Sequence, residues 1–282
     1  MKHQQIIPQP ITLNLTYPQS FIDLLNTELY KEKTPFIGYG NPSAKILIVG
    51  KEVTWGKGTP EEKRYCLDNF NDWIKNIQTK NPITIKSEVL YPEDDIHSEA
   101  FENFNPLFPH YFRYNKVGNT KPITEINGRF THQNLPYSAG PTWYKYQKLI
   151  NYIYPNRQQN EYVDFFNEAF ITELSEKTRP NNNNVTDTEA KDTCDSIVKR
   201  CPLLKEPYFQ SFPIVIYACN NYTDKIFPFI YGFEKSDFID KGWFSILERD
   251  GKLYVCTWQF SARISDKMLE ELANVIKSYL NK

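Results

Sequence analysis

Four short apolar runs stand out along the chain. They cover Lys45–Val49, Ala169–Thr172, Phe212–Ala218 and Lys252–Thr257. The first contains Ile46-Leu47-Ile48-Val49 without interruption and is followed by Gly50. An apolar run of this length that ends in glycine is typical of a strand buried on both faces of a sheet. The pattern therefore predicts four strands in the interior of a sheet.

Helical patterns separate these runs. The predicted helices are Pro18–Lys31, Glu61–Thr79, Pro141–Ile153, Thr188–Cys201 and Asp266–Leu280. The residues expected to point inward from the first two are Phe21, Leu24, Leu25, Leu29, Tyr65, Leu67, Phe70, Trp73 and Ile74. Strands that alternate with helices form a parallel sheet with helices on both faces. We therefore expect a three-layer α/β/α sandwich with a central four-stranded, mainly parallel sheet, as one domain over residues 1–282. The Pro-, Asn- and aromatic-rich region 80–140 is predicted to be an elaborated loop region of that domain.

Ligands of such sheets bind at the carboxyl ends of the strands. The segments at these ends are Gly50–Trp55, Glu173–Ser175, Cys219–Asn221 and Thr257–Ser261. The functional residues are therefore predicted to lie in these four segments, above all in the loop Gly50–Trp55.

Composition narrows the class of protein. The net charge is −1, which gives no general attraction to nucleic acid, but aromatic residues reach 15%. The stretch His110–Ile150 combines eight aromatic residues with six basic ones, namely Arg113, Lys116, Lys121, Arg129, Lys145 and Lys148. Such a stretch can follow phosphates and stack on bases, or it can be a solvated face above an aromatic core.

The five cysteines are scattered and form no Cys-x-x-Cys pair. This pattern disfavours a disulfide framework, a zinc site and an iron–sulfur site, and it suits a reducing cytoplasm. The chain starts without an apolar stretch of signal-peptide length, and no run approaches the length that spans a membrane. We therefore expect a cytoplasmic protein with no membrane association, no metal and no cofactor.

The four strand-end segments, in this order, resemble those of the uracil-DNA glycosylase superfamily. Gly50-Lys51-Glu52-Val53-Thr54-Trp55 stands where the family has Gly-Gln-Asp-Pro-Tyr-His or a relative of it. Cys256-Thr257-Trp258-Gln259-Phe260-Ser261 stands where the family has His-Pro-Ser-Pro-Leu-Ser. The middle strands match in kind, as Phe-Ile-Thr-Glu173 and Val-Ile-Tyr-Ala-Cys-Asn220.

The resemblance implies a role for residues of the first three segments. Glu52 matches the family's aspartate, and a carboxylate there stabilises the oxocarbenium-like sugar when the base is cut off. Glu173 matches the asparagine that reads the pyrimidine edge, and an ionised Glu suits the amine of cytosine better than the carbonyl of uracil. Thr54 replaces a tyrosine that blocks 5-substituted bases. Lys51, Trp55 and Asn220 complete the base-binding set. The alternatives are a helix-capping role for Glu52 and a structural ion pair for Glu173.

The last segment is predicted to contact DNA. Phe260 matches the leucine that wedges into the duplex when a base is flipped, and Arg263 can hold a phosphate. Trp258, Gln259 and Ser261 complete this DNA-binding set, while a core role for Phe260 and a solvated Arg263 are the alternatives. The family's histidine in this motif is missing, because Cys256 or Thr257 stands in its place.

The sequence thus predicts a DNA glycosylase that flips a base and hydrolyses its N-glycosidic bond, leaving an abasic site. Its substrate is uracil or a 5-modified pyrimidine such as a modified cytosine of phage DNA, and its partner is DNA, with no obligate protein partner evident. One alternative is a non-catalytic nucleic-acid-binding module on the same fold. A second is a small-molecule hydrolase that acts on free nucleosides.

Overall fold

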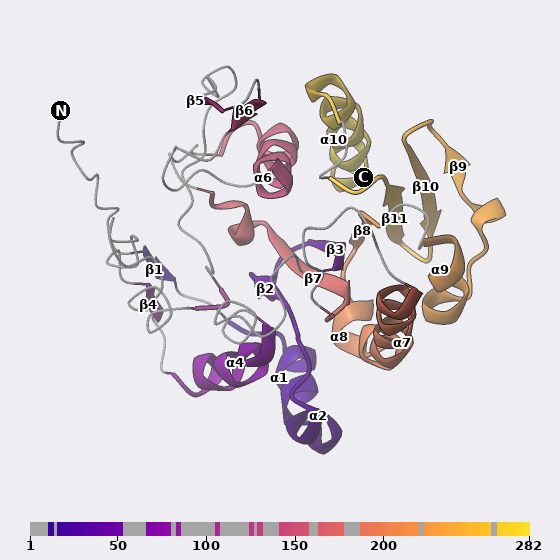
Figure 1. Cartoon of the computed structure of the whole chain (residues 1–282). Coiled ribbons are helices and arrows are strands. Elements are labelled where there is room, and N and C mark those ends of the chain that lie inside the picture. The colour runs from indigo at the N-terminus through magenta and orange to yellow at the C-terminus, as the bar shows by residue number, and fades with distance from the viewer. Residues whose placement is uncertain are drawn as a thin grey trace. The chain divides into compact units, whose positions relative to one another are not determined.

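Figure 1 shows the computed structural model of the chain, an α/β protein. The structure describes residues 11–13, 16–52, 66–79, 83–85, 105–107, 124–126, 129–131, 141–157, 163–177, 187–219, 223–260 and 264–282. Contacts divide the chain into two compact units, Met1–Pro109 with Phe166–Gln259, and His110–Phe165 with Phe260–Lys282. The single domain stays a prediction, and each unit is described by itself.

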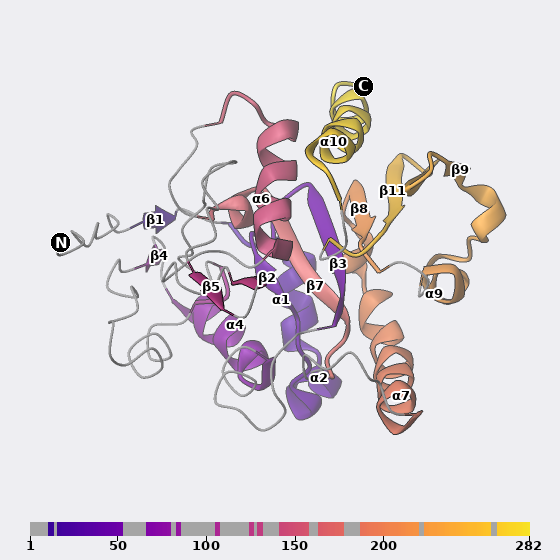
Figure 2. The same cartoon turned by 45° about the horizontal axis from the view of Figure 1, so that its top comes forward.

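A mixed seven-stranded sheet forms the centre of the first unit, in the order β2-β7-β3-β8-β11-β10-β9. Its strands are β2 Tyr39–Gly40, β3 Ile46–Glu52, β7 Ala169–Ser175, β8 Ile214–Tyr217, β9 Ile239–Asp240, β10 Phe244–Arg249 and β11 Lys252–Thr257. The middle four, β7, β3, β8 and β11, run parallel, whereas β2, β10 and β9 add antiparallel edges (Figures 1 and 2). All four predicted strands occur, but the predicted four-stranded sheet is corrected to seven strands among the described residues, because three further strands, each antiparallel to its inner neighbour, extend the parallel centre.

The central strands consist of apolar residues on both faces, so both faces are buried. Residues 46–49 of β3 are fully buried, and so are nearly all side chains of β8. Parallel strands lie in sheet interiors for this reason, since both faces need apolar cover. β3 is longer than predicted and continues through Gly50 and Lys51 to Glu52. The segment predicted as a loop from Gly50 therefore begins as strand.

A tight hairpin joins β10 to β11. The connecting residues Asp250 and Gly251 both have positive φ, 52° and 70°. Positive φ at both central residues is the mark of the type I′ turn, for which Asp-Gly is a preferred pair. Arg249 and Lys252 face each other as the last pair of this ladder.

Helices of the first unit cover one face of the sheet. They are α1 Gln19–Asn26, α4 Asn69–Gln78, α7 Asp187–Leu204, α8 Pro207–Gln210 and α9 Thr223–Tyr231, and the short helix α2 Glu28–Lys33 follows α1 (Figure 2). Phe170 of β7 contacts the rings of Phe21 in α1, Trp73 in α4 and Tyr208 in α8. On the same face, Tyr217 of β8 contacts Phe227 of α9. The helical layer on the opposite face stays a prediction.

The first two predicted helices differ from the helices of the structure, and α7 continues to Leu204, three residues beyond its predicted end. The helix predicted over Pro18–Lys31 is broken at Thr27, whose extended backbone (φ −67°, ψ 122°) separates α1 from α2. The break changes the helical phase, so Leu29, predicted to point inward, is 46% exposed, whereas Tyr30 is buried and donates to Glu206. Leu67 precedes α4 and is also exposed, contrary to prediction.

The strand β2 approaches β7 through two glycines. Gly38 has φ 139°, and a Cβ there would lie 2.2 Å from the carbonyl oxygen of Ile171. Gly40 has φ 95°, and its Cβ would lie 2.3 Å from the carbonyl oxygen of Ala169. Only glycine meets both demands, a positive φ and an absent side chain. These positions therefore fix the segment before β3 against the edge of the sheet.

In the described part of the second unit lie the helices α6 Pro141–Ile153 and α10 Asp266–Leu280, with the bounds predicted from the sequence. Gln147 of α6 accepts from the backbone N–H groups of Asp164 and Phe165 and donates to the Asp164 carboxylate, which Arg157 also binds at 2.7 Å. A short hairpin, β5 Thr124–Ile126 with β6 Arg129–Thr131, belongs to this unit.

A further two-stranded ladder, β1 Ile11–Leu13 with β4 Ile83–Ile85, lies in the first unit. The strands β4, β5 and β6 fall in the region predicted as loop. Among the described residues, none of the helices combines the length and the apolar character needed to cross a bilayer.

Candidate functional site at the carboxyl edge of the sheet

The parallel strands bring their carboxyl ends to one edge of the sheet. Gly50 of β3 lies beside Glu173 of β7, and Glu52 lies beside Ser175. On the other side of β3, Val49 pairs with Tyr217 of β8, which in turn pairs with Cys256 of β11. All four strand ends predicted to carry function therefore meet at this edge.

The order of the strands points to one place along that edge. The chain passes from β3 to β7 on one side and returns to β8 on the other side of β3. It then runs to the far edge of the sheet, where β9 and β10 precede β11. Connections that leave neighbouring strands in opposite directions open a crevice at their carboxyl ends, and ligands of open α/β sheets bind there. In this sheet the reversal lies between β3 and β8. The ends of these two strands, with β7 beside β3, therefore form the candidate site.

The carboxylate of Glu173 lies across Gly50. A Cβ built on Gly50 would lie 2.1 Å from Oε2 of Glu173 and 2.7 Å from Oε1. The carboxylate therefore fills the space that any side chain at position 50 would need. The absence of a side chain at Gly50 thus places an acidic group directly over the end of β3, beside the predicted catalytic position.

Glu52 lies at the very end of β3, and its backbone pairs with that of Ser175. Neighbouring strands are about 4.8 Å apart and rise about 3.3 Å per residue, so the Cα atoms of Glu52 and Glu173 are about 8 Å apart. Successive residues of a strand point to opposite faces, so the side chain of Lys51 leaves β3 on the face opposite to the one on which the Glu173 carboxylate lies over Gly50. The edge thus brings the backbone positions of the two predicted acidic residues close together, at the ends of two neighbouring strands.

The end of β8 is tied to the end of β3 by a thiol. Cys219 is fully buried, and its Sγ lies 3.1 Å from the carbonyl oxygen of Val49 and 3.2 Å from that of Gly50. A thiol is a weak donor, and these two oxygens accept from it. The backbone N–H of Ala218 also donates to Val49 at 2.9 Å. The strand ends at the reversal are therefore joined directly before position 220.

The end of β11 exposes a large aromatic ring. Trp258 follows Thr257 directly and is 43% exposed, and its backbone N–H donates to the carbonyl oxygen of Trp243 at 3.4 Å. Gln259, next in the chain, is half-buried. β11 is separated from β3 by one strand, so Trp258 stands about 10 Å from the end of β3. Trp258 is therefore the large aromatic residue that the end of β11 exposes, one strand away from β3.

The structure corrects the prediction for Phe260. This residue belongs to the second unit, is fully buried, and packs its ring against Tyr146 of α6 at a centroid distance of 4.9 Å. A residue that wedges into a duplex must be exposed, so the structure gives Phe260 the alternative role of a core side chain. The exposed aromatic residue of the segment is Trp258.

Several predicted residues lie outside the part of the chain that the structure describes. They are Thr54, Trp55, Asn220, Ser261 and Arg263, together with most of the basic stretch 110–150. Within that stretch, Lys148 is buried, pairs with Asp266 and lies over the ring of Tyr144. Lys148 is therefore a structural cation of the second unit and not a phosphate contact.

No protein-family model matches the chain, and a search of curated proteins finds none that is similar to it. The site is therefore interpreted from its own residues. In the part of the chain that is described, no group of three or more His, Cys, Asp or Glu side chains could hold a metal ion.

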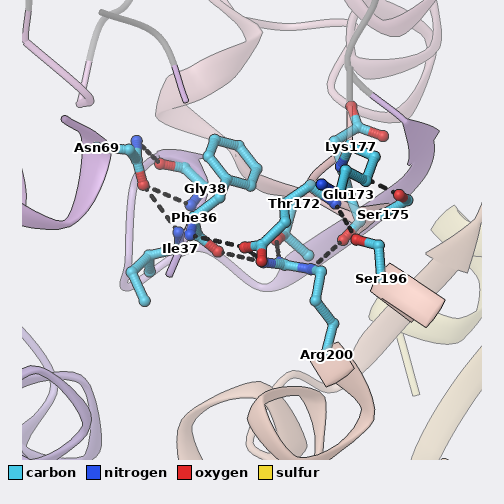
Figure 3. A network of polar contacts seen from close by, with 11 residues as sticks. Phe36, Ile37, Gly38, Asn69, Thr172, Glu173, Ser175, Lys177, Ser196 and Arg200 are labelled. Atoms are coloured by element: carbon cyan, nitrogen blue, oxygen red, sulfur yellow. Dashed lines mark hydrogen bonds and ion pairs between the residues drawn. The ribbon is translucent and has the colours of Figure 1, made fainter. Parts of the chain in front are cut away.

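A buried network supports the end of β7 from the helical face, and sequence reasoning did not find it (Figure 3). Arg200 of α7 donates to Thr172, to the backbone carbonyl of Glu173 and to that of Phe36. Next to it, Asn69 at the start of α4 accepts from the N–H groups of Ile37 and Gly38. Helical spacing is the signal that could have found Arg200, because it lies three and four positions after the buried residues Ile197 and Ser196.

Proposed function

We propose that the protein is a divergent member of the uracil-DNA glycosylase superfamily. It flips a base out of DNA and hydrolyses the N-glycosidic bond with water, leaving an abasic site. The reaction takes place at the carboxyl edge of the sheet, between the ends of β3, β7 and β8. We also propose that the protein is a three-layer α/β/α sandwich, that it is cytoplasmic and that its partner is DNA.

The observation that carries the proposal is the pair of acidic residues on neighbouring parallel strands, Glu52 and Glu173, at the edge where ligands of such sheets bind. Cleavage of a glycosidic bond develops positive charge on the sugar, and a fixed carboxylate stabilises that charge and activates water. Glu52 takes this role. Glu173, whose carboxylate lies over Gly50, contacts the base.

The substrate is a pyrimidine, either uracil or one modified at position 5. An ionised Glu173 accepts hydrogen bonds and so suits an exocyclic amine. Thr54 and Asn220 keep their predicted roles beside the base, and Thr54 leaves room for a 5-substituent. A modified cytosine of phage DNA meets both conditions, which gives the protein a part in antiviral defence.

The direct test is incubation of the protein with oligonucleotides that contain uracil, a thymine mismatch, 5-hydroxymethylcytosine or glucosylated 5-hydroxymethylcytosine, each in single- and double-stranded form. Alkali then cuts the strand at any abasic site. We expect cleavage at the modified or deaminated base and none in the unmodified strand. The Glu52→Gln variant is the matched control for a contaminating glycosylase.

Two other results would decide against the proposal. Binding of these oligonucleotides without any abasic product would support a non-catalytic binding module on the same fold. Release of the base from a free nucleoside, but not from DNA, would support a small-molecule hydrolase. Either result would be compatible with the observed fold and would overturn only the proposed reaction.

We expect Trp258→Ala to weaken binding of an oligonucleotide by about 1–3 kcal/mol, the contribution of one base that stacks on an aromatic ring. Trp258 is the exposed aromatic residue at the end of β11. Phe229→Ala is the matched control, because Phe229 of α9 is even more exposed, at 69%. The measurement is a fluorescence-anisotropy titration at fixed salt, and equal losses in both variants would remove Trp258 from the binding surface.

A further inference from the structure

Arg200 of α7 is a cation without access to water. Its side chain is 2% exposed, and each of the three guanidinium nitrogens donates hydrogen bonds. Nε donates to the Glu173 carbonyl oxygen at 2.9 Å, one terminal nitrogen donates to Thr172 Oγ1 at 2.9 Å, and the other donates to the Phe36 carbonyl oxygen at 2.6 Å (Figure 3). The planar guanidinium thus holds the end of β7 and the segment before β2 in one fixed geometry.

A buried cation requires a carboxylate to balance its charge. Burial lowers the pKa of Arg200, and the charges of Glu176 and then of Glu173 raise it in opposition. Glu176 lies 3.3 Å from the guanidinium, but its side chain is 37% exposed and also accepts from the backbone N–H of Phe36. The second carboxylate that interacts with Arg200 is that of Glu173, the residue predicted to read the base.

The two faces of β7 contact different groups, Arg200 on the helical face and Gly50 of β3 on the other. Thr172 faces α7, and its hydroxyl oxygen accepts a hydrogen bond from Arg200. The side chain of the next residue, Glu173, leaves the strand on the opposite face. There its carboxylate lies across Gly50 of β3. Because Arg200 binds the carbonyl group of Glu173 itself, the backbone from which this carboxylate projects is fixed from the helical face.

We propose that Arg200 is a positioning residue that holds Glu173 as an ionised acceptor over Gly50, so that the site selects bases with an exocyclic amino group over bases with a carbonyl group at the same position. The preferred class is cytosine modified at position 5, and uracil and its derivatives are disfavoured. This inference rests on the proposed function. An ionised carboxylate accepts from an amine but has no proton to offer a carbonyl oxygen.

The test compares two oligonucleotides that differ only in this group, one with 5-hydroxymethylcytosine and one with 5-hydroxymethyluracil. The measured quantity is the ratio of their rates of abasic-site formation. We expect the full-length protein to prefer the cytosine member by about 10- to 100-fold, the effect of one hydrogen bond to a charged group. Glu173→Gln, which offers both a donor and an acceptor, is expected to bring the ratio close to one.

A double-mutant cycle then separates positioning from general support of the fold. Arg200→Lys keeps the charge but loses the planar set of donors, so we expect the ratio to fall several-fold in the otherwise natural chain and to stay unchanged in the Glu173→Gln background. Thr172→Val removes one acceptor of Arg200 and is a milder change. The same double-mutant cycle is measured with this variant in place of Arg200→Lys. Thermal melts show that each variant is folded.

The outcomes are distinct. An equal fall of the ratio in both backgrounds would overturn the positioning role of Arg200. A preference for 5-hydroxymethyluracil would overturn the selection of an amino group while the glycosylase activity stands. Absence of abasic product from every oligonucleotide, including those with uracil, would overturn the proposed function itself.

Discussion

Glu52→Gln is expected to lower the rate of abasic-site formation at least about 100-fold, the typical effect of removing one group that stabilises charge in a transition state. The substitution keeps the size of the side chain and removes its negative charge. Glu52 ends β3 beside Ser175, and its Cα atom lies about 8 Å from that of Glu173. In the proposed reaction this charge stabilises the developing sugar cation, so we expect the loss to appear in the chemical step.

Single-turnover kinetics with enzyme in excess measures that step, and an anisotropy titration measures binding separately. Oligonucleotide affinity should change little, because the interaction is made in the transition state. Glu32→Gln is the matched control, since Glu32 is an exposed acid of α2 in the same unit. An unchanged single-turnover rate in Glu52→Gln would show that another group stabilises the sugar.

Gly38→Ala is expected to destabilise the fold by several kcal/mol. The added Cβ would lie 2.2 Å from the carbonyl oxygen of Ile171 and would require an L-residue at φ 139°. The Ile171 carbonyl group cannot move away to relieve the overlap, because Ile171 is held in the ladder between β2 and β3. Overlap with rigid backbone and a strained φ each cost free energy.

Gly232→Ala is the matched control for this effect. Gly232 also has a positive φ, 74°, but nothing lies within 4 Å of its Cβ position. It should therefore lose only about 1 kcal/mol from backbone strain. Urea unfolding monitored by circular dichroism measures both variants, and similar midpoints would mean that β2 moves away from β7 to admit the methyl group.

The sequence predicted the parallel centre of the sheet well, because its signals are local. Uninterrupted apolar runs marked β3 and β8, and the helix α10 begins at Asp266 as expected, after Ser265, whose Oγ accepts from the Met268 N–H. The hairpin partner β10 was missed although Asp250-Gly251 is a strong turn signal, because β10 is only partly buried and its pattern is mixed.

The candidate site was harder to predict for a physical reason. Glu52 and Glu173 were proposed as site residues because each follows an apolar run. Arg200 lies 27 positions after Glu173 and Phe36 lies 164 positions before Arg200, so their association depends on tertiary contacts. Phe260 was misread because an aromatic side chain gives the same signal in a core and on an interaction surface.

The two outermost strands of the sheet have a consequence for behaviour at high concentration. β2 and β9 are each two residues long, and β9 carries Asp240, whose carboxylate accepts from the N–H of Gly242. Open sheet edges can recruit a strand from another molecule and so start aggregation, and very short or charged outer strands prevent this. Among the residues that the structure describes, the sheet therefore ends on both sides in short strands that discourage growth by strand addition, which should keep the protein dispersed when it is concentrated.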